Sequence, residues 1–217
     1  MSIHGDLISQ VLHIRHHITG HQEPVRGTAF FFNRNYRQYF VTALHVVPDI
    51  YTNPTIEVFL DNKWNSLRVN VISLGVGAID IAVLELPNSP QSNANSMVKS
   101  DIQYGDHIHF LGFPYGLSGG TVGTTVFPIP FVKTGIISGV VEESGVRRLF
   151  FDGYNNPGFS GGPLAYMTSS GLAVAGVVTS AFMVGTENTG IGVALSIAHA
   201  IDLIDQSAVA IPPGRHS

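Results

Sequence analysis

The sequence predicts an all-β fold of two packed antiparallel six-stranded β-barrels that ends in a short C-terminal helix. Three observations favour this fold. Short apolar runs of strand length recur along the chain, 24 glycines and 12 prolines supply turns between them, and a polar Asn/Ser-rich stretch over residues 88–100 separates the runs into two sets. Composition alone does not distinguish two barrels from a β-sandwich.

The N-terminal barrel is expected over residues 1–87, followed by a linker over residues 88–100. Two apolar runs, at residues 27–32 and 39–47, flank the polar segment NRNYRQ, which is the pattern of a β-hairpin. Further candidate strands lie at residues 11–16, 56–60, 67–75 and 79–86.

The C-terminal barrel is expected over residues 101–195. Its candidate strands lie at residues 107–113, 131–143, 148–153, 172–182 and 190–195. Apolar residues then recur at helical spacing and Ser196 is a candidate N-cap, so a helix is expected over residues 196–208 before a tail over residues 209–217. The apolar, proline-bearing segment at residues 124–131 is interpreted as an ordinary connection, with a loop over the cleft or a partner-binding patch as the alternative.

Charge and composition exclude several classes of function. The chain carries a net charge of -4 and no lysine- or arginine-rich run, so neither nucleic acid nor a membrane surface is an expected partner. It contains no cysteine, which excludes disulfides and cysteine chemistry. The N-terminus lacks the basic, apolar and small-residue order of a signal peptide, so a cytoplasmic location is expected.

The segment Gly158-Phe159-Ser160-Gly161-Gly162 is the sharpest motif in the chain. A serine hydroxyl becomes a useful nucleophile only with a base to take its proton and with N–H groups aimed at the developing oxyanion. Glycines on both sides of Ser160 allow the backbone to turn those N–H groups toward one point. The alternative is a glycine-rich β-turn without chemistry.

Two further residues complete a nucleophilic constellation. His45 follows the apolar segment YFVTAL, and Asp80 interrupts the apolar run IDIAVL. Taken singly, each is more simply a packed or solvent-facing residue. However, a carboxylate within an apolar run is costly unless partners satisfy it, and an aspartate that orients a histidine ring would have such a partner.

Together, TALH, DIAVL and GFSGGP resemble the histidine, aspartate and serine motifs of trypsin/chymotrypsin-like serine peptidases, in the same order along the chain. GTAFFF, FLGFPYG and GIGVAL extend the resemblance toward the cysteine-free bacterial HtrA/Deg branch, here without a PDZ domain, over about residues 8–207. The resemblance implies a chymotrypsin-like double barrel with the catalytic triad His45, Asp80 and Ser160, and an oxyanion hole at Gly158, Phe159 and Ser160.

The same resemblance implies the substrate-binding residues. The specificity pocket is expected at Tyr154 and Asn155 with Ile191 nearby, and the strand that pairs with the substrate backbone at Thr179, Ser180 and Ala181. Tyr154 takes the place of an aspartate that would select lysine or arginine, so a pocket for small or apolar side chains is expected.

Phe159 departs from the family pattern. Trypsin-type enzymes have an aspartate at this position, which pairs with a newly cut N-terminus, so the chain cannot use that activation switch. Without that switch, the serine loop either has its active conformation as soon as the chain folds or is regulated by a change in loop order. A third possibility is that the bulky Phe159 ring disturbs the loop.

The preferred function is therefore a serine endopeptidase that acts on a protein or peptide substrate through an acyl-enzyme and needs no cofactor. The alternatives are a catalytically latent protease-fold binding or regulatory protein and an esterase with the same triad. A regulatory protein partner and the oligomeric state are left open. The histidine-rich segment His13, His16, His17 and His21 lacks the helical HExxH signature of a zinc site, so no metal site is expected.

Overall fold

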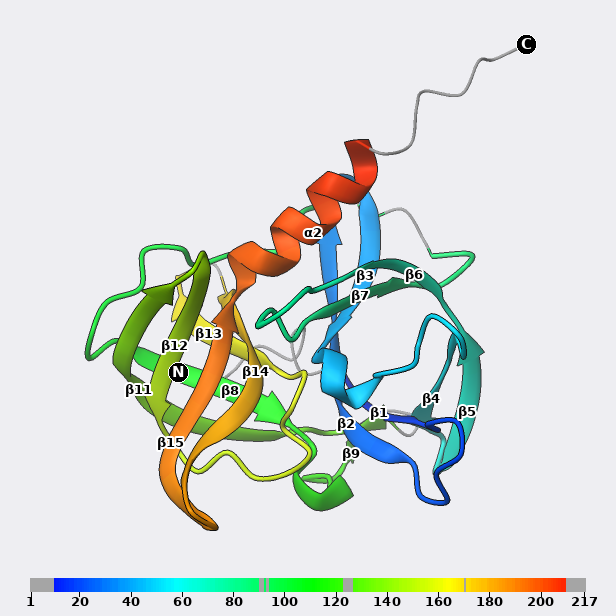
Figure 1. Cartoon of the computed structure of the whole chain (residues 1–217), viewed down its shortest axis with the longest axis horizontal. Helices are drawn as coiled ribbons and strands as arrows, with labels where there is room; N and C mark the ends of the chain where they lie inside the picture. Colours follow the sequence, from blue (N-terminus) through cyan, green and yellow to red (C-terminus); the bar gives the residue numbers. More distant parts are fainter. Residues whose placement is uncertain (1–9, 90–91, 93, 123–126, 170, 210–217) are drawn as a thin grey trace.

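The computed structural model describes residues 10–89, 92, 94–122, 127–169 and 171–209. These form two β units that lie side by side, with one helix running along both (Figure 1). Residues 1–9, 123–126, 170 and 210–217 lie outside the described part of the chain, as do positions 90, 91 and 93 of the expected linker. The exact boundaries of the predicted units stay a prediction.

The first unit is one curled antiparallel sheet in the order β5-β4-β1-β2-β3-β7-β6. Its strands are β1 (Val11–His16), β2 (Val25–Arg34), β3 (Arg37–Thr42), β4 (Thr55–Leu60), β5 (Lys63–Arg68), β6 (Asn70–Leu74) and β7 (Ala82–Glu85). Two-residue turns with positive φ at both positions join β2 to β3 and β4 to β5, which matches the right-handed twist of hairpin strands.

This sheet has seven strands, whereas a closed six-stranded barrel is expected from the sequence. The expected strand at residues 67–75 is divided at Val69, whose N–H donates to the carbonyl of Pro54, the residue just before β4. β5 therefore pairs with β4, and β6 pairs with β7 at the opposite end of the ladder. The chain through Val69 joins the two ends of the curl, but no strand pairing closes it.

The second unit is a closed six-stranded barrel in the order β11-β12-β15-β14-β13-β8, as expected. Its strands are β8 (His107–Gly112), β11 (Phe131–Glu143), β12 (Val146–Asp152), β13 (Pro163–Thr168), β14 (Gly171–Val184) and β15 (Glu187–Ser196). A two-stranded ribbon, β9 (Thr121–Val122) with β10 (Phe127–Pro128), connects β8 to β11.

The helix α2 (Ile197–Val209) follows β15 directly. The Ser196 hydroxyl accepts a hydrogen bond from the Ala198 N–H at 3.3 Å, which is the role of an N-cap. Among the described helices, none combines the length and the apolar character needed to cross a bilayer.

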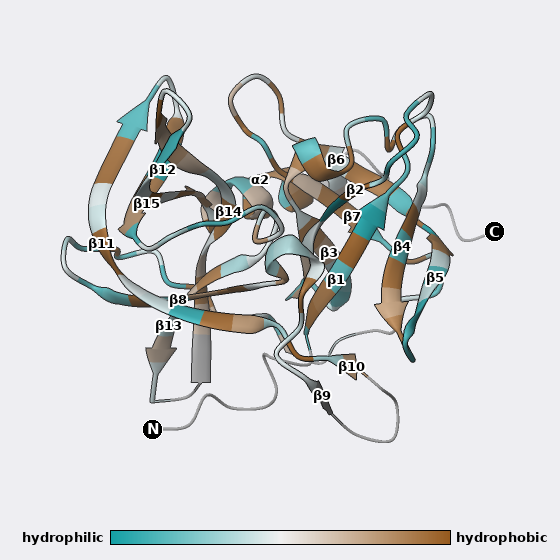
Figure 2. Cartoon of the chain, turned by 90° about the horizontal axis from the view of Figure 1, so that it is seen from below, coloured by the Kyte–Doolittle hydropathy of each residue, from teal (hydrophilic) through white to brown (hydrophobic). Residues whose placement is uncertain are grey.

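Three hydrophobic clusters fill the molecule. One lies inside each unit, and the third joins side chains of both units to the apolar face of α2. In Figure 2 the strands of both units carry long hydrophobic stretches, whereas the outer strand β5 is largely hydrophilic. The third cluster packs the two units against each other, and this packing positions the loops that carry the candidate site.

Candidate active site

His45 lies in the short 3-10 turn η1 (Leu44–Val46), which follows β3. The Asp80 carboxylate binds this residue twice, because Oδ2 lies 2.6 Å from the His45 Nδ1 and Oδ1 accepts the His45 backbone N–H at 2.8 Å. The Leu44 N–H also donates to the Asp80 carbonyl at 3.3 Å. A carboxylate at Nδ1 keeps the proton on that nitrogen, which leaves Nε2 free to act as a base.

The serine loop packs against the segment that leads into this turn. A Cβ added at Gly161 would lie 2.2 Å from the Thr42 Oγ1 and 2.9 Å from the Ala43 nitrogen. The Ser160 carbonyl also accepts the Thr28 N–H at 2.8 Å. The tertiary structure therefore brings Ser160, from the second unit, to the turn that carries His45, from the first.

The Ser160 hydroxyl donates to the Thr179 carbonyl at 3.2 Å. Within the described part of the chain, no hydrogen bond joins this hydroxyl to the His45 ring. A hydroxyl rotates freely about its Cβ–Oγ bond, and catalytic hydrogen bonds in ligand-free structures are often long or absent.

The backbone at Gly158 adopts a conformation that requires glycine. Its φ is +105°, and an added Cβ would lie 2.2 Å from the Phe113 carbonyl oxygen, so only glycine fits here. The Pro157 carbonyl accepts the Tyr115 N–H at 2.7 Å. Since the two dipoles of a trans peptide point in opposite directions, this bond turns the Gly158 N–H away from Tyr115. Among the described residues, neither Gly158 nor Ser160 has an acceptor for its N–H.

Phe159 anchors this loop in the core of the second unit. Its ring is fully buried and meets the Phe110 ring edge-on at 5.1 Å. The ammonium of Lys133 lies 5.4 Å from the Phe159 ring centroid, and partial burial lowers the pKa of this lysine. The ring therefore packs into the barrel without displacing the serine loop. The Thr28 hydroxyl holds the loop from the other side by donating to the Gly158 carbonyl at 2.6 Å.

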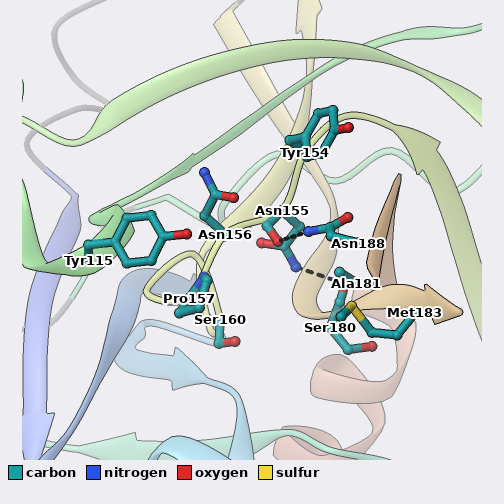
Figure 3. A pocket seen from close by; sticks show the side chains of 10 residues that line it. All are labelled: Tyr115, Tyr154, Asn155, Asn156, Pro157, Ser160, Ser180, Ala181, Met183 and Asn188. Atoms are coloured by element: carbon teal, nitrogen blue, oxygen red, sulfur yellow. Dashed lines mark hydrogen bonds between the residues drawn. The ribbon is translucent and has the colours of Figure 1, made fainter. Parts of the chain in front are cut away.

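A pocket of about 470 Å³ adjoins Ser160 (Figure 3). Five of its lining residues are among the site residues predicted from the sequence, namely Tyr154, Asn155, Ser160, Ser180 and Ala181. The structure adds lining residues that were not predicted as site residues, at Tyr115, Asn156, Pro157, Met183 and Asn188. Asn156 and Pro157 directly precede the serine motif, and Tyr115 belongs to the FLGFPYG motif, so these three could have been inferred from the sequence. Met183 and Asn188 reach the pocket only through the fold.

Thr179 and Ile191 do not line this pocket. Thr179 is buried and contacts Ser160 through its carbonyl group. Ile191 lies on β15 opposite Asp152 of β12. Their roles in substrate binding stay a prediction.

The histidine-rich N-terminal segment is dispersed. His13 is buried among aromatic rings, His16 bonds to Asp49 and Thr55, and His17 bonds to Glu57. Across the described residues, no group of three or more histidine, cysteine, aspartate or glutamate side chains is arranged to hold a metal ion.

A closed antiparallel six-stranded barrel beside a curled antiparallel sheet defines the chymotrypsin-like class of folds. Residues 27–175 match the family model described as a trypsin-like peptidase domain. The chain therefore belongs to the trypsin-like peptidase family, whose members are serine protease hydrolases.

Solved structures of HtrA-type proteases share this fold. The serine endoprotease from Yersinia pestis matches with a TM-score of 0.65 and 22% identity, over 93% of this chain and 63% of that one. The HtrA-type protease AlgW with a decapeptide matches with a TM-score of 0.65 and 19% identity, over 94% of this chain and 65% of that one.

The inactive form of Rv3671c from M. tuberculosis H37Rv matches with a TM-score of 0.62 and 17% identity, over 96% of this chain and 91% of that one. This chain thus spans less than two thirds of the Yersinia pestis and AlgW chains. No curated protein sequence matches it.

Proposed function

We propose that the protein is a serine endopeptidase with His45, Asp80 and Ser160 as its catalytic triad. The observation that carries the proposal is the double hydrogen bond from the Asp80 carboxylate to His45, beside a serine in a loop where only glycines fit. A carboxylate held in this way fixes the ring tautomer and stabilises the imidazolium that forms during proton transfer.

In the proposed mechanism the Ser160 Oγ attacks the carbonyl carbon of the scissile peptide, and its proton passes to the His45 Nε2. The negative charge that develops on the carbonyl oxygen is stabilised by the N–H groups of Gly158 and Ser160. His45 returns the proton to the amine as the C–N bond breaks, which leaves an acyl group on Ser160. A water molecule, deprotonated by His45, then releases the acid and restores the hydroxyl.

Two features of the loop support a preformed oxyanion hole. The bond from Tyr115 to the Pro157 carbonyl orients the Gly158 N–H, and the burial of Phe159 holds the loop in place. A donor that is already oriented costs no reorganisation in the transition state, which is why such sites lower the barrier so effectively.

Labelling with a fluorophosphonate tests this proposal, because the probe reacts with an activated serine and is independent of peptide specificity. We expect the wild-type protein to be labelled at Ser160 and the Ser160→Ala variant to be unlabelled. The variants His45→Ala and Asp80→Asn should label more slowly by several orders of magnitude, on the order of 10⁴-fold for the carboxamide. Equal labelling of wild type and Ser160→Ala would contradict the proposal.

One observation favours a second candidate, a protease fold whose site is latent until a partner binds. The Ser160 hydroxyl bonds to the Thr179 carbonyl and not to His45. If this arrangement persists, wild-type protein would resist the probe while remaining folded, and labelling would appear only when a partner or an extended peptide is added.

A further inference from the structure

Lys133 points toward the interior of the second barrel from β11. It pairs with Phe110 of β8, and residues directly opposite each other on antiparallel strands face the same side of the sheet. Phe110 is fully buried in the hydrophobic cluster of this unit, so the lysine shares the inner face with it. A lysine on an inner face needs an explanation, because its charged form loses solvation there.

An ion pair does not supply that explanation. The ion pairs that join lysine or arginine to a carboxylate among the described residues do not include Lys133. Burial alone lowers the pKa of this lysine, because desolvation penalises its charged form. The ammonium instead donates to the Tyr154 carbonyl at 2.6 Å and lies 5.4 Å from the ring centroid of Phe159.

These two contacts join the two ends of one loop. Tyr154 begins the segment that runs along the pocket to Ser160, and Phe159 immediately precedes that serine (Figure 3). A cation is attracted to the face of an aromatic ring, and the attraction grows when water is excluded. One ammonium therefore holds the beginning of the loop by a hydrogen bond and its end by the Phe159 ring.

The oxyanion donor lies between these two points. The Gly158 N–H belongs to the same loop, and Lys133 is not among the residues that line the pocket. Its ammonium can therefore influence the reaction only through the shape of the loop. Other contacts remain when it is removed, since the Thr28 hydroxyl still donates to the Gly158 carbonyl and Asn155 still donates to the Ser180 carbonyl.

From these contacts we propose that Lys133 is a positioning residue, whose ammonium clamps the loop from Tyr154 to Phe159 in the shape that presents the oxyanion donors. This inference rests on the proposed peptidase function. In trypsin-type enzymes the ammonium that acts next to the serine is a newly cut N-terminus. Here a side chain of the barrel itself supplies the ammonium, so the clamp forms as the chain folds.

The variant Lys133→Met tests the clamp, because methionine keeps an unbranched side chain without the charge. An apolar side chain suits the inner face, so the urea midpoint of unfolding should equal or exceed that of the wild type. Fluorophosphonate labelling of Ser160 should nevertheless slow by about 10- to 100-fold, somewhat less than the loss of a whole oxyanion donor. A merely structural role would lower the midpoint and the labelling rate together, and labelling at the wild-type rate would also overturn the inference.

Lys99→Met is the matched control. The Lys99 ammonium also lies near an aromatic ring, 5.5 Å from the Tyr166 centroid, and it pairs with Asp101 at 3.0 Å. None of these residues belongs to the serine loop, so this variant should be labelled at the wild-type rate. Equal slowing in Lys99→Met and Lys133→Met would show that the effect is not specific to the clamp, and would overturn the inference.

The absence of cysteine from the chain permits a rescue of the charge alone. Lys133→Cys introduces a single thiol, which 2-bromoethylamine alkylates in denaturant to a side chain with the length and the ammonium of lysine. Alkylation with 1-bromopropane gives the same chain with a methyl group at its end. After refolding, we expect the aminoethyl form to be labelled at close to the rate of wild-type protein treated in the same way, and the propyl form to be as slow as Lys133→Met. Equal rates for the two forms would overturn the inference.

Failure of this inference can be separated from failure of the proposed function. If wild-type protein and Lys133→Met react equally fast with the probe, the protein has an activated serine whose loop does not depend on the lysine. If the wild-type protein does not react at all, the peptidase proposal itself is contradicted, and the positioning role is contradicted with it.

Discussion

Single residues decide whether the serine loop can adopt its shape. Phe159 occupies a position where trypsin-type enzymes carry an aspartate, and from the sequence a bulky ring there could disturb the loop. Instead the ring is fully buried against Phe110 and beneath the Lys133 ammonium. Burial of an aromatic side chain thus anchors the loop where an ion pair would otherwise do so, and this anchor needs no cleavage of the chain.

Gly158 offers the sharpest test at the residue scale. In Gly158→Ala the new methyl group would lie 2.2 Å from the Phe113 carbonyl oxygen, so the loop has to move and the oxyanion N–H is displaced. Loss of one such donor costs about 10²–10³-fold in rate, and we expect fluorophosphonate labelling of Ser160 to slow by that factor.

The matched control is Gly145→Ala in the turn between β11 and β12. Gly145 also has a positive φ, +76°, but an added Cβ would meet nothing within 4 Å. This variant should lose about 1–2 kcal/mol of stability from the left-handed conformation and should label at the wild-type rate. Slow labelling in both variants would mean that general destabilisation, and not the oxyanion geometry, controls reactivity.

At the scale of an element, β1 carries a histidine that the fold keeps neutral. His13 is 5% exposed and stacks on Phe113 at 4.9 Å, with the Trp64 ring edge-on at 4.8 Å. Burial lowers the pKa of His13 to about 4, and the nearby charges of Arg26 and Arg15 add to the effect. In the unfolded chain a histidine titrates near its usual pKa of about 6.5.

Between these two pKa values the unfolded state binds more protons than the folded state. The contribution of His13 to stability is therefore fully present above about pH 6.5 and is lost as the pH falls toward about 4. We expect the loss to reach about 3 kcal/mol at most, and to be absent in His13→Phe, which keeps the aromatic stack but does not titrate.

Urea unfolding followed by the fluorescence of Trp64, the single tryptophan of the chain, at pH 7, 5.5 and 4 measures this difference. His21→Gln, at an exposed position, is the control and should keep the pH dependence of the wild type. An identical pH dependence in His13→Phe and wild type would show that His13 is not held neutral in the folded protein.

At the scale of the whole molecule, α2 joins the two β units. The cluster that contains side chains of both units also includes three residues of the helix, Ile197, Ala200 and Ile204. In addition, the Asp205 carboxylate accepts hydrogen bonds from the Nε and Nη2 of Arg34 on β2, at 2.8 and 2.6 Å. Since the candidate site is assembled from loops of both units, the packing of this helix bears on function as well as on stability.

Ile204 is fully buried, and Ile204→Ala should lower the free energy of unfolding by about 2–5 kcal/mol. We expect one transition with the same midpoint by Trp64 fluorescence, which reports the first unit, and by far-UV circular dichroism, which reports both. The substitution Gln206→Ala at an exposed neighbouring position should change the free energy of unfolding by no more than about 0.5 kcal/mol. Two separate transitions in Ile204→Ala would show that the units unfold independently.

Much of the architecture follows from local pattern. Apolar runs and turn signals predicted the all-β fold and the helix near Ile197, because strand and helix periodicity depend on neighbouring residues. The closed second barrel was expected from the family resemblance, and its strand β13 (Pro163–Thr168) was not among the candidate strands. The break at Val69 was not predicted, because the strand pattern of residues 67–75 continues through this residue, whereas the pairing partner of the chain changes there from β4 to β7.

The sequence by itself determined which residues are candidates for chemistry. The motifs around His45, Asp80 and Ser160 are short and local, and the structure brings the first two into hydrogen-bond contact and sets the serine loop against their turn. Only the tertiary structure decided how Phe159 is accommodated, that the Gly158 carbonyl is held by Thr28, and that Asn155 keeps an unpartnered oxygen beside the pocket. Each of these depends on contacts between residues far apart in the chain, and such contacts are set by packing, which local sequence patterns do not encode.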